Sequence, residues 1–298
     1  MAAEASTALL DEYTTLFDAA GGAALRLSET DPIGKNDVLL VIDMQNDFLP
    51  ASDAPDGGRF GVAEGGSAVP TMIALINKFT DAEAVVVATR DYHPVDHCSF
   101  DSEGGPFPSH CVQGSVGSKF FPPIGEALTE ARKRHDNVHI VFKGFFEEID
   151  SFGAFKYAEP HAETRLAHKL DVPVSCGVPW TGAFKLKQSN LSNDIDAPPD
   201  VLSVTKKVPL ADLLRTAAGG AVKRIFVVGL ALDFCVLDTA LTAAGADFED
   251  VIVVLDASRA AHIPGVGSVG SGFLTDPKTM VEQCADKVKF VNSSAILG

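Results

Sequence analysis

Six short runs of apolar residues, rich in valine and isoleucine, recur along the chain. Such runs are typical of strands buried on both faces, and they lie at residues 37–44, 84–91, 137–144, 224–232, 250–258 and 287–291. Segments with apolar positions at helical spacing separate most of them, at residues 69–81, 124–135, 210–220, 235–247 and 276–286. This alternation predicts a doubly wound α/β fold, with a mainly parallel sheet and helices on both faces.

Two segments depart from the alternation. Near the N-terminus, Leu9, Tyr13 and Phe17 recur at helical spacing, which predicts a helical extension over residues 1–36. Residues 156–203 carry Pro, Gly, Asn and Asp without a clear period, and we interpret them as an insertion. The remaining pattern predicts one domain over residues 37–298 that contains this insertion.

Composition narrows the class of protein. The chain has 298 residues, 46% of them hydrophobic, and a net charge of −16, which argues against nucleic acid and anionic membranes as partners. No stretch reaches the roughly 18 apolar residues of a membrane span, and the acidic start is atypical of a signal peptide. The five cysteines are an odd number without a CxxC pair, which favours reduced thiols in a cytoplasmic enzyme. The sequence does not determine whether the protein forms homo-oligomers.

Reactive side chains follow four of the predicted strands. Asp43, Asp91, Lys143 and Cys235 each lie at or just after a strand end, and in doubly wound sheets the ligand crevice lies there. A cysteine at a helix N-terminus favours the thiolate, Asp43 could accept its proton, and Lys143 could orient Asp43. The alternative is that Cys235 is a small buried hydrophobe, Lys143 a surface lysine and Asp43 a helix cap.

A second group of residues has metal-ligand character. Asp91 and His93 lie two residues apart at a strand end, and His110 follows on a loop rich in Pro and Gly. One carboxylate and two imidazoles form an open site that suits zinc, iron or manganese. His97 is undecided between ligand and polar loop residue, and Asp96 and Glu103 are weaker candidates. Cys98 lies past the strand end and is not expected to be the nucleophile.

Five short motifs in order resemble those of the nicotinamidases, within the isochorismatase-like cysteine hydrolases. They are "VLLVIDMQNDFLP", "ATRDYHP…H", "PSHCVQGSVGS", "FKGF…FGAF" and "GLALDFCV", and the resemblance spans residues 37–157 and 221–258. It implies a three-layer α/β/α fold and a metal-dependent amidase of NAD metabolism and pyridine nucleotide salvage. The implied reaction hydrolyses nicotinamide to nicotinate and ammonia through a cysteine thioester.

The resemblance also implies roles for individual residues. The catalytic triad falls on Asp43, Lys143 and Cys235. The oxyanion hole falls on the backbone amides of Ala231 and Cys235, with a cis peptide bond between Leu230 and Ala231. The turn departs from the family pattern at one position, where Leu232 replaces a small polar residue.

The substrate pocket and the metal site follow in the same way. The resemblance implies a metal, zinc before iron or manganese, held by Asp91, His93 and His110, with His97 a further ligand in some members. Aromatic walls for the pyridine ring fall on the phenylalanines Phe48, Phe107 and Phe234, and Phe107 stands where the family commonly has Trp. The alternatives are a relative acting on another small amide or ureido substrate, an isochorismate-cleaving enzyme, and a non-catalytic binding protein with this fold.

Overall fold

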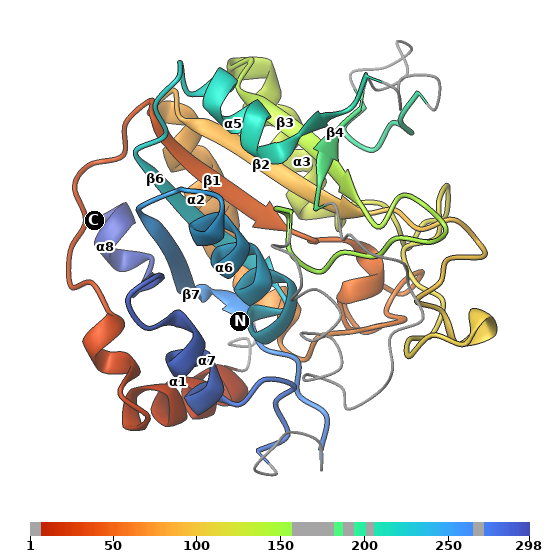
Figure 1. Ribbon diagram of the computed structural model, residues 1–298, viewed down its shortest axis with the longest axis horizontal. Helices are drawn as coiled ribbons and strands as arrows, with labels where there is room; N and C mark the ends of the chain where they lie inside the picture. The colour runs from red at the N-terminus through yellow and green to blue at the C-terminus, as the bar shows by residue number, and fades with distance from the viewer. Residues whose placement is uncertain (1–6, 157–181, 187–193, 201–205, 265–270) are drawn as a thin grey trace, which may run out of the picture.

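The computed structural model describes residues 7–156, 182–186, 194–200, 206–264 and 271–298. Within them lies one eight-stranded sheet in the order β5-β4-β3-β2-β1-β6-β7-β8 (Figure 1). Six strands are parallel: β1 (Asp37–Ile42), β2 (Val85–Asp91), β3 (Val138–Lys143), β6 (Arg224–Leu230), β7 (Val251–Arg259) and β8 (Lys289–Val291). Two short antiparallel strands, β4 (Phe184–Lys185) and β5 (Val208–Pro209), form one edge.

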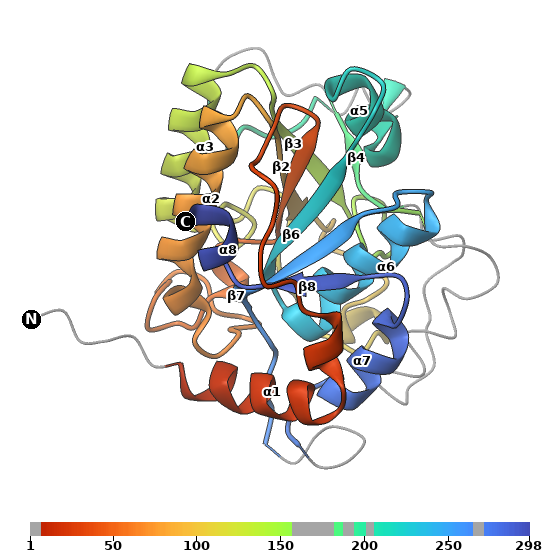
Figure 2. The ribbon, with the colours of Figure 1, turned by 90° about the vertical axis from the view of Figure 1, so that its left-hand side faces the viewer.

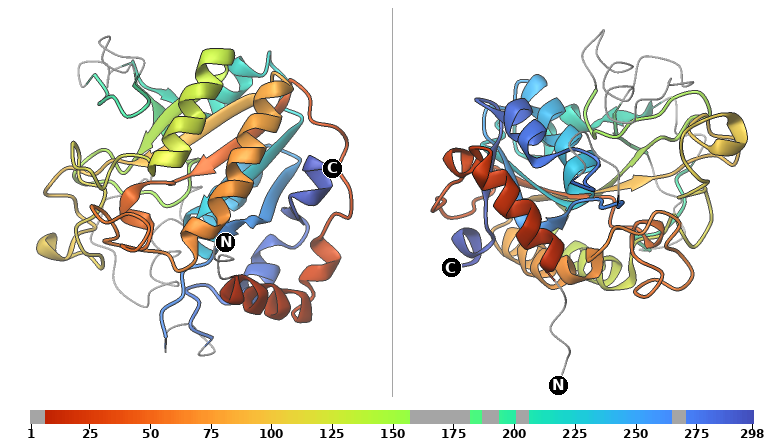
Figure 3. Two further views of the ribbon diagram at one scale, coloured as in Figure 1. Left: turned by 180° about the vertical axis from the view of Figure 1, so that it is seen from behind. Right: turned by 90° about the horizontal axis from the view of Figure 1, so that it is seen from below.

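Helices cover both faces of this sheet. Helices α2 (Val69–Asp81) and α3 (Pro122–Arg134) lie on one face, and α5 (Leu210–Ala217) and α6 (Leu237–Gly245) lie on the other (Figures 2 and 3). The predicted three-layer α/β/α architecture is therefore confirmed. Among the described residues, no helix combines the length and apolar character that a membrane crossing needs.

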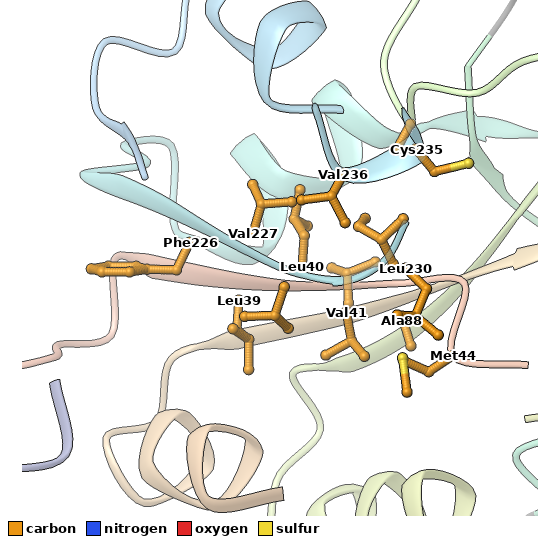
Figure 4. Close-up of a cluster of buried hydrophobic side chains, with 14 of the residues drawn as sticks. Leu39, Leu40, Val41, Met44, Ala88, Phe226, Val227, Leu230, Cys235 and Val236 are labelled. Carbon is orange, nitrogen blue, oxygen red and sulfur yellow. The ribbon is translucent and has the colours of Figure 1, made fainter. Parts of the chain in front are cut away.

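The core lies on both sides of the central strands. Every residue of β1 is buried, because parallel strands with helices above and below bury side chains on both faces. Figure 4 shows aliphatic side chains of β1 and β6 packed together, with Leu40 and Val227 on one side and Val41 on the other. Cys235 lies at the edge of this cluster, and its sulfur points away from the packed side chains.

The N-terminal helix packs against the end of the chain. Helix α1 (Ala8–Ala19) contacts α7 (Pro277–Cys284), and the short helix α8 (Ser294–Leu297) ends the chain. Both Tyr13 and Phe17 are fully buried, with the Tyr13 ring 4.8 Å from that of Phe273 and the Phe17 ring 4.7 Å from that of Phe290. The apolar side chains of this helix therefore pack into the same hydrophobic core as those of the sheet.

Two features differ from the sequence prediction, and one prediction falls outside the described residues. The helix expected to begin at residue 235 begins at Leu237, because Leu232–Val236 form a π-helical turn before it. Strands β4 and β5 and helix α8 were not predicted, since segments of two to four residues carry no readable period. Most of the predicted insertion at 156–203 lies outside the described residues.

The expectation that all cysteines are reduced is wrong at one position. Cys98 is disulfide-bonded. Cys111, Cys235 and Cys284 are free thiols, and all three are buried. An odd number of cysteines does not exclude one bridge between distant positions, which spacing alone could not reveal.

Candidate active site

Four adjacent strands bring the predicted acid, lysine and thiol together. Because β3, β2, β1 and β6 are neighbours in the sheet, their carboxyl ends meet at one edge. The Lys143 Nζ lies 2.9 Å from Asp43 Oδ2, 2.6 Å from Asp91 Oδ1 and 3.7 Å from Cys235 Sγ. The lysine thus contacts two carboxylates and the thiol at once, in a position where it is fully buried.

Asp43 occupies a constrained position just after β1. Its φ is 49°, in the left-handed region that aspartate tolerates better than most residues. The Thr89 hydroxyl donates to Asp43 Oδ1 at 2.6 Å and accepts from the Asp43 backbone N–H at 2.9 Å. Burial raises the pKa of Asp43 to about 6, although the Lys143 ammonium and the Thr89 hydrogen bond both oppose that rise. A carboxylate with this pKa is suited to exchange protons near neutral pH.

The surroundings of Cys235 favour the protonated form of its thiol. Burial raises its pKa well above the usual value, and the carboxylates of Asp43 and Asp91 raise it further, while Lys143 lowers it. Burial and the two carboxylates therefore oppose the thiolate that a helix N-terminus by itself favours. The thiol therefore needs a proton acceptor, and the neighbouring Asp43 can serve as one.

The end of β6 turns sharply to place the thiol. Gly229 has a φ of 124°, and a Cβ there would lie 2.2 Å from the Ile42 carbonyl oxygen, so only glycine fits. The Leu230–Ala231 peptide bond is cis, as the resemblance implied. The Ala231 carbonyl then accepts hydrogen bonds from the backbone amides of residues 234 and 236, at 3.0 and 3.1 Å. Leu232 is fully buried on this turn.

Asp91, His93 and His110 form a cluster that suits a cation. One ligand atom from each lies within 4.8 Å of the others. His93 Nδ1 lies 2.8 Å from the Gly144 carbonyl oxygen, and His110 Nδ1 lies 2.8 Å from that of Pro108. A ring nitrogen that donates to a carbonyl leaves the other nitrogen, Nε2, with a free lone pair, which is the usual arrangement of metal-binding histidines.

The electrostatics of this cluster also suit a divalent metal. Burial opposes ionisation of Asp91, but Lys143 and His93 outweigh it and hold the pKa of Asp91 well below its usual value. Burial lowers the pKa of His110 to about 4, and repulsion from His93 contributes. The cluster therefore offers an ionised carboxylate and a neutral imidazole over a wide pH range. This donor set fits zinc, iron or manganese.

Two small features hold this cluster in place. The loop that carries His110 runs beside His93, since the His93 amide donates to the Cys111 carbonyl at 3.1 Å. Gly144 has a φ of 55°, and a Cβ there would lie 2.2 Å from His93 Cε1, so glycine leaves room for the imidazole. The requirement for glycine at position 144 was not predicted from the sequence.

His97 lies beside this cluster with both ring nitrogens engaged. The Ser99 amide donates to His97 Nδ1 at 3.4 Å, so His97 Nε2 is the nitrogen that donates to the Ile149 carbonyl, at 3.2 Å. The ring centroids of His97 and His93 are 4.1 Å apart. In this tautomer neither nitrogen of His97 has a lone pair available for a metal. The weaker candidates Asp96 and Glu103 are exposed on the surrounding loop.

An aromatic pocket connects the thiol to the histidine cluster. Ala231 and Cys235 line it together with Asp91, His93 and His110. The five phenylalanines that wall it are Phe48, Phe60, Phe107, Phe152 and Phe234. Three of these were predicted. Phe60 and Phe152 were missed, because both come from loops whose direction depends on the tertiary fold. Asp150 also lines the pocket and was missed.

Comparison with known proteins gives one domain match and several relatives. Residues 37–144 match the isochorismatase domain. The nicotinamidase of Acinetobacter baylyi is 27% identical over 246 residues, which cover 77% of this chain and 84% of the relative. PnC1 from L. infantum, solved in complex with nicotinate, is 27% identical with a TM-score of 0.56, and 90% of this chain and 98% of that chain are covered. Residues 37–144 therefore belong to the isochorismatase domain family.

Two further proteins are similar to this chain. The pyrazinamidase of Pyrococcus horikoshii, solved in complex with zinc, is 25% identical with a TM-score of 0.54, and 86% of this chain and 99% of that chain are covered. The nicotinamidase of Escherichia coli is 32% identical over 132 residues, which cover 39% of this chain and 55% of that relative.

The isochorismatase domain match does not reach the thiol. It ends at residue 144, whereas Cys235 follows β6. Strand β6 nevertheless pairs with β1 in parallel, from Asp37 and Arg224 to Ile42 and Gly229. The sheet therefore brings Cys235 to the residues of the matched segment.

Proposed function

We propose that this isochorismatase-like amidase hydrolyses nicotinamide to nicotinate and ammonia, through a thioester on Cys235 and with the help of a divalent metal, zinc before iron or manganese. The observation that carries the proposal is the shared pocket, which is lined by Cys235 and by the Asp91–His93–His110 cluster. Lys143 lies behind the thiol and contacts both Cys235 and Asp43. Nicotinamidases among the relatives support this choice of substrate.

The first half of the proposed reaction forms the thioester. Asp43 takes the proton from Cys235 Sγ, and the sulfur attacks the amide carbon of the substrate. Lys143, within 3.7 Å of the sulfur, stabilises the developing thiolate. The backbone amides of Ala231 and Cys235 are the proposed oxyanion hole, and one such donor contributes about 10²–10³ in rate in other enzymes.

The second half releases the products. When the tetrahedral intermediate collapses, Asp43 gives its proton to the departing nitrogen, so ammonia leaves and the acyl group remains on sulfur. A water molecule then attacks the thioester carbon, Asp43 accepts its proton, and the C–S bond breaks. The proton returns to Cys235, and nicotinate is released. Asp43 thus acts in turn as base, acid and base, for which a pKa of about 6 is suited.

The proposed metal ligands are Asp91, His93 and His110, and we propose that His97 positions His93 rather than binding the metal. When bound, the ion would supply a Lewis acid that holds the pyridine nitrogen and orients the carboxamide toward the thiol. The aromatic side chains of Phe48, Phe107 and Phe234 would pack against the ring. Aromatic pairs of this kind contribute about 0.5–1.5 kcal/mol each.

A substrate panel with and without chelator tests the proposal. Ammonia release should be measured with nicotinamide, with a non-aromatic amide and with an N-carbamoyl substrate, on zinc-loaded and chelator-treated protein. Release from nicotinamide alone, lost with chelator and restored by zinc, is the expected result. If ammonia is released preferentially from the N-carbamoyl substrate, the substrate of the enzyme is a ureido compound and not nicotinamide. Full activity in the chelator-treated protein would refute the role of the metal.

A further inference from the structure

An acidic side chain without an assigned role lines the pocket. Asp150, on the loop after β3, is only 3% exposed. Its Oδ1 accepts a hydrogen bond from the Ser151 backbone amide at 2.7 Å, and no lysine or arginine among the described residues forms an ion pair with it. Burial of a carboxylate is costly unless a cation or several hydrogen bonds compensate it. Its position therefore indicates that a positive charge binds nearby.

The Asp150 carboxylate lies beside two of the histidines. Ligand atoms of His93, His97 and Asp150 lie within 4.8 Å of one another, and His93 also belongs to the cluster with Asp91 and His110. A Cβ on Gly144 would lie 2.2 Å from His93 Cε1 and 3.5 Å from Asp150 Oδ1. The Asp150 carboxylate and the His93 ring therefore approach the same small volume.

The charges around the cluster are not balanced for a divalent cation. Asp43 and Asp91 are the nearby carboxylates, and the Lys143 ammonium contacts both, at 2.9 and 2.6 Å. When Asp43, Asp91 and Lys143 are all ionised, their charges sum to −1. A bound divalent cation carries +2, so one positive charge would remain without a partner in the buried site. Asp150 would supply the second negative charge, since it has no cation of its own among the described residues.

We propose that Asp150 is an outer carboxylate of the cation site, which binds through a water molecule of the cation's hydration shell and strengthens metal binding. This inference rests on the metal site of the proposed function. Direct ligation is not favoured, because Asp150 groups with His93 and His97 and not with the full set of Asp91, His93 and His110. Outer groups of this kind typically change metal affinity by about 10- to 100-fold when they are replaced.

The test measures zinc affinity without substrate, by competition with a chromophoric chelator. Asp150→Asn keeps the shape of the side chain and removes its charge, so zinc affinity should fall about 10- to 100-fold while one zinc still binds at saturation. Glu148→Gln is the matched control, because it removes an exposed negative charge from the same loop and should leave zinc affinity unchanged. The thermal midpoint of metal-free Asp150→Asn should equal or exceed that of the unmodified protein.

The outcomes separate this inference from the proposed function. Zinc affinity in Asp150→Asn equal to that of the unmodified protein would overturn the inference and leave the metal site intact. A lower thermal midpoint of the metal-free variant would assign Asp150 a structural role instead. If neither the unmodified protein nor His93→Ala binds zinc, the role of the metal in the proposed function is refuted. The inference about Asp150 is then refuted as well.

Discussion

The hydrogen bond from Thr89 to Asp43 helps to set the pH at which the proposed base ionises. The Thr89 hydroxyl donates to Asp43 Oδ1 at 2.6 Å, and both residues are fully buried. This hydrogen bond favours the carboxylate and so lowers the pKa of Asp43, against the effect of burial. Thr89→Val keeps the shape of the side chain and removes the donor. The pKa of Asp43 should therefore rise above about 6 in the variant.

The size of the shift follows from the charge on the acceptor. A hydrogen bond to a charged group contributes about 1.5–3 kcal/mol, and one pKa unit corresponds to about 1.4 kcal/mol, so the pKa should rise by about one to two units. At pH 6 the proportion of ionised Asp43 would fall from about half to between about one tenth and one hundredth. Because the ionised form is the active base, kcat/KM at pH 6 should fall about 5- to 50-fold. Well above pH 8 the kcat/KM of Thr89→Val should equal that of the unmodified protein.

A pH profile of kcat/KM for ammonia release provides the assay. Thr80→Val is the matched control, because Thr80 is also buried and its hydroxyl donates to the Ile76 carbonyl at 2.7 Å, within α2 and far along the chain from the site. Its acid limb should coincide with that of the unmodified protein. A Thr89→Val profile lowered equally at every pH would refute the reasoning, since a general structural defect would then explain the loss.

Three other substitutions test the site. Lys143→Met leaves two buried carboxylates without their cation, so the free energy of unfolding in urea should fall by about 3–5 kcal/mol, and an unchanged value would contradict the buried ion pairs. Gly144→Ala places a Cβ 2.2 Å from His93 Cε1, so the purified protein should lose its metal, and a full zinc content by elemental analysis would contradict that packing. Phe107→Ala removes a pocket wall and should raise KM about tenfold with kcat little changed; an unchanged KM would exclude this wall from binding.

Much of the sheet could be predicted because its strands are buried on both faces. β1 and β6 appear in the sequence as continuous apolar runs, and their observed ends lie within two residues of the predicted ones. The strand-end rule also indicated Asp43, Asp91 and Lys143, since it depends on topology and not on side-chain detail. The edge strands β4 and β5 are only two residues long, and their pairing is a consequence of the tertiary fold.

The parts of the site that were missed depend on contacts between distant segments. Thr89 is one of several polar or small residues in β2, and only the register between β1 and β2 shows that its hydroxyl reaches Asp43. Asp150 lies on a loop, where no periodicity indicates the direction of the side chain. The upward direction of the Cys235 pKa shift was also missed, because a local helix argument cannot include burial beside two carboxylates.

Ammonia release from nicotinamide by the purified, zinc-loaded protein and by its Cys235→Ala variant tests the proposed chemistry most directly. The unmodified protein should release ammonia and nicotinate in equal amounts. Cys235→Ala should release neither and should still bind nicotinamide, because the aromatic walls and the histidine cluster remain. No release from the unmodified protein, or undiminished release from the variant, would contradict nicotinamide hydrolysis through a thioester on Cys235.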